Sequence, residues 1–169
     1  MKVLDLGCGP NKTPGAIGLD KAKIQGVDIV HDLEKFPYPF KDNEIDKVIS
    51  THCVEHIDNF VGLMEEIHRI CKPNAEIKFI VPYYTSKDFF TDFTHKHAFT
   101  EHTFNYFDDN HPYSYYSKAR FKVEHVKFQY SAIGRWIPIR RILRHYLFNI
   151  VDHLEFTLRV IKEDKKAKK

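Results

Sequence analysis

The first nine residues place the strictest limit on how this chain can fold. Val3, Leu4 and Leu6 form a short apolar run that leads into Gly7-Cys8-Gly9, where two glycines stand one residue apart. Such a run predicts a buried strand, and the glycines predict a turn that needs unusual backbone angles or close approach of another group. Ligands of open α/β sheets bind beyond the carboxyl ends of the strands. We therefore expect a ligand at this turn; the alternative is a tight strand exit without one.

Composition indicates a globular protein of one domain. The chain has 169 residues, of which 43% are hydrophobic and 29% charged, and no apolar run approaches the about 20 residues of a membrane-spanning helix. Three scattered cysteines do not form a disulfide framework and no secretory signal opens the chain, so we expect a cytoplasmic protein. The net charge of +3 is small, which argues against a nucleic-acid partner.

The first half of the chain alternates strands with one clear helix. Further strands are expected at residues 16–20, 27–33, 46–51 and 76–81, each from a short apolar or β-branched run. Apolar residues recur at helical spacing after Asp58, which we expect to cap the helix, until Pro73 stops the pattern. This alternation predicts an α/β fold with a parallel sheet.

The second half is predicted from weaker patterns. We expect a helix near residues 100–107, a half-buried strand over 121–130, a helix over 138–151 and a last strand over 154–161. Residues 1–162 are predicted to form a single domain, followed by a charged, disordered tail at 163–169.

Several segments of the first half resemble one family. They are Val3 to Gly9, Gly18-Leu19-Asp20, Asp32-Leu33 ahead of Phe36-Pro37, Asp46 to Ser50 running into Val54 to Ile57, Glu66 to Pro73, and Ile80-Val81-Pro82. In this order they resemble class I S-adenosylmethionine-dependent methyltransferases, most of all the group called methyltransferase type 11. The resemblance covers Met1 to about Pro82. It implies a Rossmann-like methyltransferase sheet, mostly parallel with an antiparallel last strand, and S-adenosyl-L-methionine as cofactor.

The resemblance assigns roles at the methionine end of the cofactor. Gly7 and Gly9 would let that part lie against the backbone, and Asp5 would orient the turn and the bound amino group. Ser50 and His52 would flank the methionine end.

Two further acids would hold the nucleoside. Asp20, at the end of the second strand, would accept hydrogen bonds from the ribose hydroxyls. Asp32 would accept one from the adenine amino group, while the Leu33 amide would donate to the ring. For each acid, capping of a turn or strand end is the competing interpretation.

The loop that follows the fifth strand offers candidates for chemistry. Methyl transfer depends mostly on positioning, and a general base adds to it. Histidine suits this role because it exchanges a proton near neutral pH. We expect His95, then His97, to act as the base, with His52 as a third catalytic candidate and Asp92 as an orienting or substrate-contacting group. Loop histidines with only structural hydrogen bonds are the alternative.

Two tyrosines directly after the fifth strand could contact the substrate. Tyr83 and Tyr84 would bind it or shield the sulfonium by a cation–π contact; the alternative is that both belong to the core.

A metal site is a second interpretation of the same region. His52, Glu55 and His56 would share one side of a helical turn, and His97 could join them around a divalent ion. The pattern is similar to the Glu-x-x-Glu-His site of small-RNA 3′-terminal 2′-O-methyltransferases, with His52 in place of the first Glu.

One face of the predicted sheet lacks helices. Residues 10–15 and 21–26 are too short for the helices that relatives place there, which would leave aliphatic side chains exposed. We expect residues 83–117, the 138–151 helix, or a second copy of the chain in a homodimer to cover that face.

The segment 136–147 mixes arginines with apolar residues. It is open to three interpretations: peripheral contact with an anionic membrane or lipid-linked substrate, binding of phosphate or RNA, or packing on the uncovered face.

These patterns together predict a methyltransferase acting on a small-molecule or glycan- or lipid-linked acceptor with a histidine base. The alternatives are a non-catalytic module that binds the cofactor or a partner, and a metal-assisted RNA methyltransferase.

Overall fold

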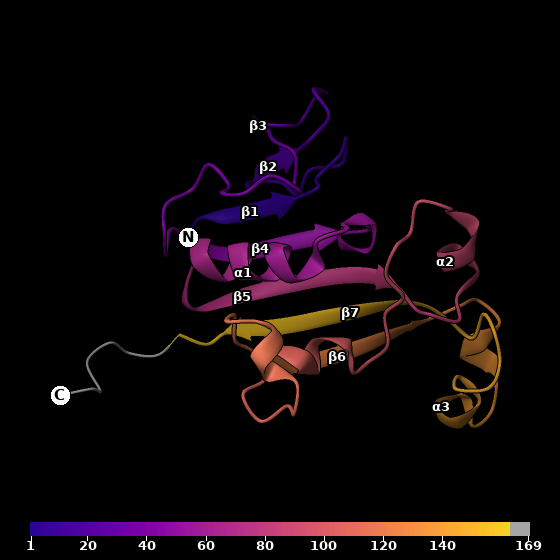
Figure 1. The fold of residues 1–169 in the computed structure, drawn as a ribbon. Coiled ribbons are helices and arrows are strands. Elements are labelled where there is room, and N and C mark those ends of the chain that lie inside the picture. The colour runs from indigo at the N-terminus through magenta and orange to yellow at the C-terminus, as the bar shows by residue number, and fades with distance from the viewer. Residues whose placement is uncertain (163–169) are drawn as a thin grey trace.

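The computed structural model describes residues 1–162 and contains one seven-stranded sheet. The strand order is β3-β2-β1-β4-β5-β7-β6, and only β7 runs antiparallel to its neighbours (Figure 1). The strands are β1 (Val3–Leu6), β2 (Ile17–Asp20), β3 (Ile29–Val30), β4 (Ile45–Thr51), β5 (Cys71–Pro82), β6 (Phe121–Tyr130) and β7 (Val151–Val160). This confirms the predicted mostly parallel sheet with an antiparallel last strand.

The helices are few and mostly short. They are α1 (Phe60–Ile70), α2 (Lys87–Thr91) and α3 (Arg140–Leu143), with 3₁₀ turns η1 (Val54–His56), η2 (Thr103–Phe107), η3 (Ser114–Tyr116) and η4 (Gly134–Trp136). Asn59, and not Asp58, caps α1, because its side-chain oxygen accepts the Gly62 amide at 2.9 Å. The strand predicted at 27–33 shrinks to Ile29–Val30.

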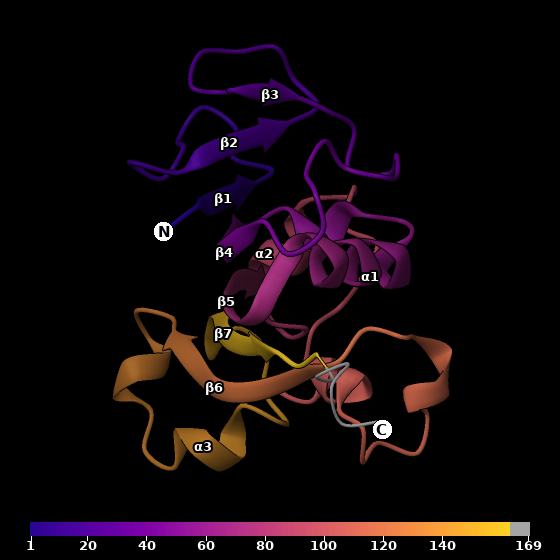
Figure 2. The same ribbon diagram turned by 90° about the vertical axis from the view of Figure 1, so that its left-hand side faces the viewer.

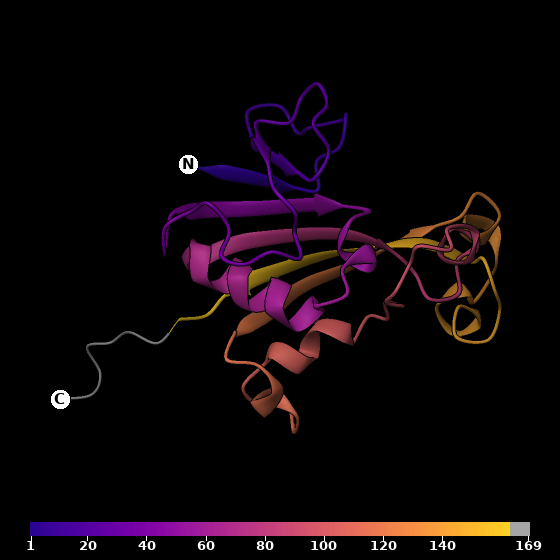
Figure 3. The same cartoon turned by 45° about the horizontal axis from the view of Figure 1, so that its top comes forward.

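The core lies on one face of the sheet. Helix α1 packs there, and η2 lies beside it on the same side (Figures 2 and 3). The Phe104 ring of η2 stacks on Phe79 at 5.3 Å and meets Phe156 edge-on at 4.7 Å, while Phe60 of α1 lies 5.9 Å from it. Residues 83–117 therefore extend the face that α1 covers, instead of covering the opposite one as predicted.

The opposite face is polar, so the premise for a covering layer was wrong. Lys47 of β4 pairs with Glu76 of β5 at 2.8 Å, and Arg159 of β7 lies between Glu76 and Glu124 of β6. Long charged side chains lay their methylene stems on a sheet and keep their charges in water. Over β1 and β2 the loop at Cys8 and Lys12 packs against Gly18. A homodimer is therefore not needed to cover this face, and the predicted homodimer stays a prediction.

The helix predicted over residues 138–151 was wrong: only Arg140–Leu143 is helical. Ile139 and Asn149 have positive φ, which ends regular helix on both sides. The segment is an excursion between antiparallel β6 and β7, closed where the Ser131 amide donates to the Ile150 carbonyl at 3.0 Å. It projects beyond the sheet beside α2 (Figure 1), so its apolar side chains do not pack on a sheet face and stay exposed.

Among the described residues, no helix is long and apolar enough to cross a membrane. The tail predicted at 163–169 lies outside the described residues, and the single domain over 1–162 stays a prediction.

Candidate cofactor and acceptor site

A cavity of about 590 Å³ lies at the carboxyl ends of the strands around β1. The chain order reverses between β1 and β4, and such a switch point is where open α/β sheets bind ligands. A volume of this size is typical of small-molecule sites, which span about 300 to 1,000 Å³. The cavity is lined by Gly7, Asp20, Lys21, Asp32, Leu33, Glu34, His52, Cys53, His56, Ile57, Asp58, Thr94 and Lys96.

Both positions of the turn favour glycine because of their backbone conformation. Gly7 and Gly9 have φ of 67° and 51°, in the left-handed region that favours glycine. A Cβ at Gly7 would lie 2.1 Å from the Cys53 Sγ, so this position is closed by packing. A Cβ at Gly9 would meet nothing within 4 Å, so this backbone faces open space, as expected for a surface on which a ligand lies.

Asp20 ends β2 in the cavity wall. Its Oδ2 accepts the Gly9 amide at 2.9 Å and its Oδ1 accepts the Ala22 amide at 2.9 Å. A carboxylate has about four lone-pair sites, so two remain for a ligand's hydroxyl groups. The backbone thus fixes the orientation of Asp20 before any ligand binds.

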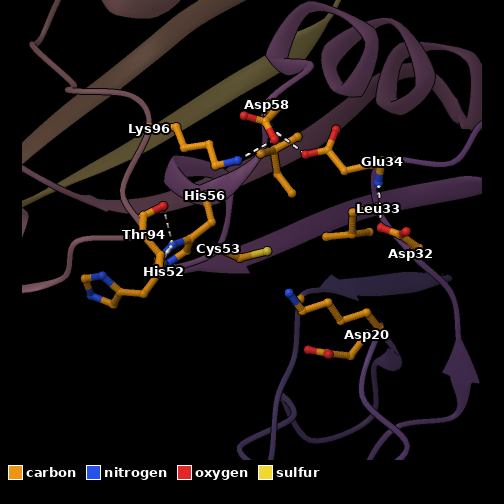
Figure 4. A pocket seen from close by; sticks show the side chains of 13 residues that line it. Asp20, Asp32, Leu33, Glu34, His52, Cys53, His56, Asp58, Thr94 and Lys96 are labelled. Carbon is orange, nitrogen blue, oxygen red and sulfur yellow. Dashed lines mark hydrogen bonds and ion pairs between the residues drawn. The ribbon is translucent and has the colours of Figure 1, made fainter.

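Asp32 and Leu33 stand beside Asp20 on the same wall (Figure 4). Asp32 Oδ1 accepts the Glu34 amide at 3.1 Å, the turn-capping bond that was its alternative role. The Leu33 carbonyl accepts the Tyr38 hydroxyl at 2.9 Å, whereas the Leu33 amide makes no hydrogen bond with any described residue. The N–H of Leu33 is therefore free to donate a hydrogen bond to a heterocyclic ring.

Three predicted cofactor residues, Asp5, Gly9 and Ser50, do not line the cavity. Asp5 is buried, and its Oδ2 accepts the Thr13 amide at 2.6 Å, which holds the loop after the glycine turn. Ser50 is buried as well, and its hydroxyl donates to the Leu6 carbonyl at 2.8 Å. Asp5 thus holds the loop at Thr13, and Ser50 ties β4 to β1.

The wall opposite Asp20 and Asp32 carries histidines (Figure 4). His52 lies at the margin, with 41% of its side chain exposed and its Nδ1 3.3 Å from Oε1 of Glu55. Its φ of 51° belongs to a sparsely populated region where strain is often associated with function. Burial raises the pKa of Cys53 to about 12, so this thiol stays protonated and is no nucleophile.

The two histidines predicted as first choices for the base lie outside the cavity lining. The side chain of His95 is 7% exposed and lies against His56, with ring centroids 4.7 Å apart, and its Nδ1 is 2.8 Å from the Phe89 carbonyl oxygen. His97 turns its Nε2 to the Ile57 carbonyl at 2.8 Å. The loop is held to η1 because the Lys96 amide donates to the Glu55 carbonyl at 2.8 Å.

The predicted substrate residues are also displaced from the cavity. Tyr83 is wholly buried in the core and Tyr84 packs edge-on against it at 4.7 Å; neither lines the cavity. Asp92 acts one step away, because its Oδ1 accepts the Thr94 hydroxyl at 2.6 Å and that hydroxyl lies 2.9 Å from the His56 Nδ1. Asp92 thus orients His56, not His95.

The predicted metal set is only partly assembled. Glu55, His56 and His95 place one ligand atom each within 4.8 Å of one another, and His52 borders them through Glu55. His97 lies outside this group because its Nε2 is engaged by Ile57. Among the described residues, His95 and not His97 lies with Glu55 and His56.

Sequence reasoning missed several lining residues: Lys21, Glu34, Cys53, His56 as a cavity group, Asp58, Thr94 and Lys96. Glu34 accepts the Asp58 amide at 2.6 Å, and Lys96 pairs with Asp58. These bonds join three loops that are distant in sequence. Only the position of each loop after a strand end could have indicated them.

The residues fit the cofactor implied by the resemblance. Near this strand-end hollow lie bare backbone at Gly9, which donates to Asp20 but is not among the lining residues, free acceptor capacity at Asp20 and an unused amide at Leu33. These match a carboxylate-bearing chain, a ribose diol and an adenine ring, respectively.

Comparison with known proteins supports the same conclusion. Residues 9–79 match the family model described as methyltransferase domain. A structure of an S-adenosylmethionine-dependent methyltransferase from Archaeoglobus fulgidus is 20% identical, with a TM-score of 0.66, covering 93% of this chain and 85% of that one. Another from Mesorhizobium loti is 15% identical, with a TM-score of 0.61 and coverage of 94% and 90%.

This chain has the class I S-adenosylmethionine-dependent methyltransferase fold. The family match implies S-adenosyl-L-methionine as the cofactor, as predicted. The [4+2]-cyclase SpnF has the same fold, with 12% identity, a TM-score of 0.62 and coverage of 96% and 75%, so the fold alone does not specify methyl transfer. No curated protein matches the sequence.

Proposed function

We propose that this protein is an S-adenosylmethionine-dependent methyltransferase. The observation that carries the proposal is that Gly7, Asp20, Asp32 and Leu33 line one cavity at the switch point of the sheet. The nucleoside would lie between Asp20 and Leu33, and the methionine part would run past the glycine turn toward the histidine wall. S-adenosylmethionine supplies a methyl group activated by its sulfonium sulfur.

His52 is the general base that this geometry favours. It is the most exposed of the three candidate histidines and it borders the cavity, with its Nδ1 3.3 Å from Oε1 of Glu55. The acceptor's oxygen or nitrogen would bond to the methyl carbon as the carbon–sulfur bond breaks, and its proton would pass to His52.

We further propose that the protein binds a lipid surface and methylates its acceptor there. Beyond the sheet end that holds the cavity, the excursion between β6 and β7 exposes a set of large apolar side chains: Ile133, Trp136, Ile139, Ile142, Tyr146, Leu147 and Phe148. Phe148 lies 5.7 Å from Phe90 of α2, which extends the surface toward the cavity loop. Arg135, Arg140 and Arg141 are exposed among them, a pattern that favours an anionic bilayer and an acceptor linked to it.

Turnover tests the proposal. The protein is incubated with S-adenosylmethionine and a panel of small hydroxyl and amine acceptors, glycans and glycolipids, and S-adenosylhomocysteine is measured. We expect turnover with at least one acceptor and a 10²- to 10⁴-fold lower kcat in His52→Asn, a residue that tolerates positive φ. Cofactor binding without turnover on any acceptor favours the non-catalytic module instead.

Vesicles test the lipid surface. We expect the protein to float with vesicles containing phosphatidylserine and to stay unbound with neutral ones, and Trp136→Ala with Arg141→Ala to abolish flotation. Equal flotation of this variant, or none of the wild type, contradicts the proposal, and salt-sensitive RNA retention would favour the RNA alternative.

A further inference from the structure

Glu55 is a buried carboxylate without a hydrogen-bond donor. Its side chain is 0% exposed, and neither Oε1 nor Oε2 accepts a hydrogen bond from any residue the structure describes; His52 Nδ1 lies 3.3 Å from Oε1 without forming one. A buried charge without a partner is costly, and buried carboxylates are normally paired, hydrogen-bonded or bound to a metal. The side chain faces His56 and His95, with His95 Nε2 3.9 Å from Oε1.

The His95 ring is oriented by a backbone carbonyl. Its Nδ1 lies 2.8 Å from the Phe89 carbonyl oxygen, and a carbonyl only accepts, so Nδ1 carries the proton. In the neutral ring Nε2 then keeps its lone pair, and this is the atom that faces Glu55. Packing against Phe89 at 5.6 Å prevents the buried ring from turning away.

The His56 ring is oriented in the same way through a hydroxyl. Thr94 Oγ1 donates to Asp92 Oδ1 at 2.6 Å, so toward the His56 Nδ1, 2.9 Å away, it can only accept. Nδ1 of His56 therefore carries the proton and Nε2 keeps the lone pair. The Asp92–Thr94–His56 chain and the Phe89–His95 contact are the supports that metal-binding imidazoles have in proteins.

Three acceptors thus converge with no donor among them. We propose that Glu55, His56 and His95 bind a divalent first-row transition-metal ion, of the zinc, manganese or iron(II) class. One carboxylate and two imidazole nitrogens suit these ions, and a set of three leaves positions open for other ligands. His56 lines the cavity, so an ion bound there would lie at the cavity's margin.

At that place the ion would hold an oxygen of the acceptor. A hydroxyl bound to it is fixed in position and loses its proton more readily, with His52 next to the ion's carboxylate to take that proton. This role rests on the proposed methyl transfer. Binding of the ion itself does not, since it needs only the three side chains.

Cobalt(II) is the probe, because its visible absorption reports nitrogen and oxygen coordination. The purified full chain, treated with a chelator and dialysed, is titrated with CoCl₂. We expect a saturable band with one equivalent bound, no such band in Glu55→Gln or His56→Gln, and displacement by Zn²⁺. His125→Gln, an exposed histidine of β6, is the matched control and should bind as the wild type does.

Thr94→Val separates a metal site from a structural cluster. It removes the group that orients His56 without touching a ligand, and such supports are worth about 10- to 100-fold in metal affinity. An absent band in the wild type, or equal affinity in wild type, Glu55→Gln and His56→Gln, overturns the inference. Binding of S-adenosylhomocysteine to the chelator-treated protein is measured separately by calorimetry. Absence of that binding would contradict the proposed function but not the metal site.

Discussion

The two walls of the cavity treat their carboxylates in opposite ways. On the cofactor wall, both oxygens of Asp20 accept backbone amides, and Asp5, which lies behind that wall, accepts one at 2.6 Å. Behind the histidine wall, Glu55 accepts none from any described residue, although it is the most deeply buried of the three. The first wall is organised by the chain alone, whereas the second is left with excess negative charge and lone pairs.

This difference indicates two kinds of binding surface. Backbone amides position the cofactor wall, so its shape depends on a few turn residues and not on a ligand. The histidine wall has positioned rings around a buried carboxylate that accepts no hydrogen bond from any described residue, and the proposed metal site rests on this arrangement. Substitutions that affect turn geometry should therefore act mainly through the first wall, and substitutions that affect charge mainly through the second.

The largest effect is expected at Gly7. Alanine there must keep a φ of 67° and place its Cβ 2.1 Å from Cys53 Sγ, a combination of strain and overpacking worth about 2 to 5 kcal/mol. Thermal unfolding should shift down by roughly 10 °C. Gly9→Ala, with positive φ but no neighbour within 4 Å, is the control and should lose less than half as much. Equal shifts would mean that packing under Cys53 does not matter.

A pair of charge-removing variants should change stability in opposite directions. In chelator, Asp5→Asn should lower the unfolding free energy by about 1.5 to 3 kcal/mol, because a buried amide loses its charged acceptor. Glu55→Gln should raise it by about 1 kcal/mol, because a buried unpaired charge is removed. Chemical denaturation measures both. A loss in Glu55→Gln as large as that in Asp5→Asn would show that the walls do not differ.

The smallest effect concerns pH. Burial, followed by the neighbouring His52, lowers the pKa of His153, whose ring lies 4.7 Å from that of His52. The unfolded chain, with the ordinary value of 6.5, therefore takes up a proton before the folded one does, so stability falls as the pH drops below 6.5. His153→Gln should flatten that decline in unfolding temperature, and exposed His125→Gln should not. An unchanged slope in His153→Gln would exclude it as a source of acid sensitivity.

Local patterns predicted the sheet, because strand ends, turn glycines and acids reflect short-range backbone needs. The family resemblance added the cofactor roles of Gly7, Gly9, Asp20, Asp32 and Leu33, and four of these residues, Gly9 being the exception, line the cavity. The histidine wall depends on how the loop at 92–97 folds back on η1. His95 lies in that wall and His97 does not, because the His95 ring contacts the Phe89 carbonyl and the His97 ring contacts the Ile57 carbonyl. Residue spacing in the sequence does not reveal such contacts. The 138–151 pattern misled because periodicity predicts a helix only if a surface exists to bury it.

The central claim is that Asp20 faces a bound adenosyl group. Calorimetric titration with S-adenosylhomocysteine should give one site, with affinity about 10- to 100-fold weaker in Asp20→Asn, since hydrogen bonds to a charged group are worth about 1.5 to 3 kcal/mol. Asp28→Asn is matched to it, because Asp28 also accepts a backbone amide, that of Gly18 at 2.7 Å, but does not line the cavity. Its affinity should equal that of the wild type. No binding to the wild type, or equal losses in both variants, would contradict the account.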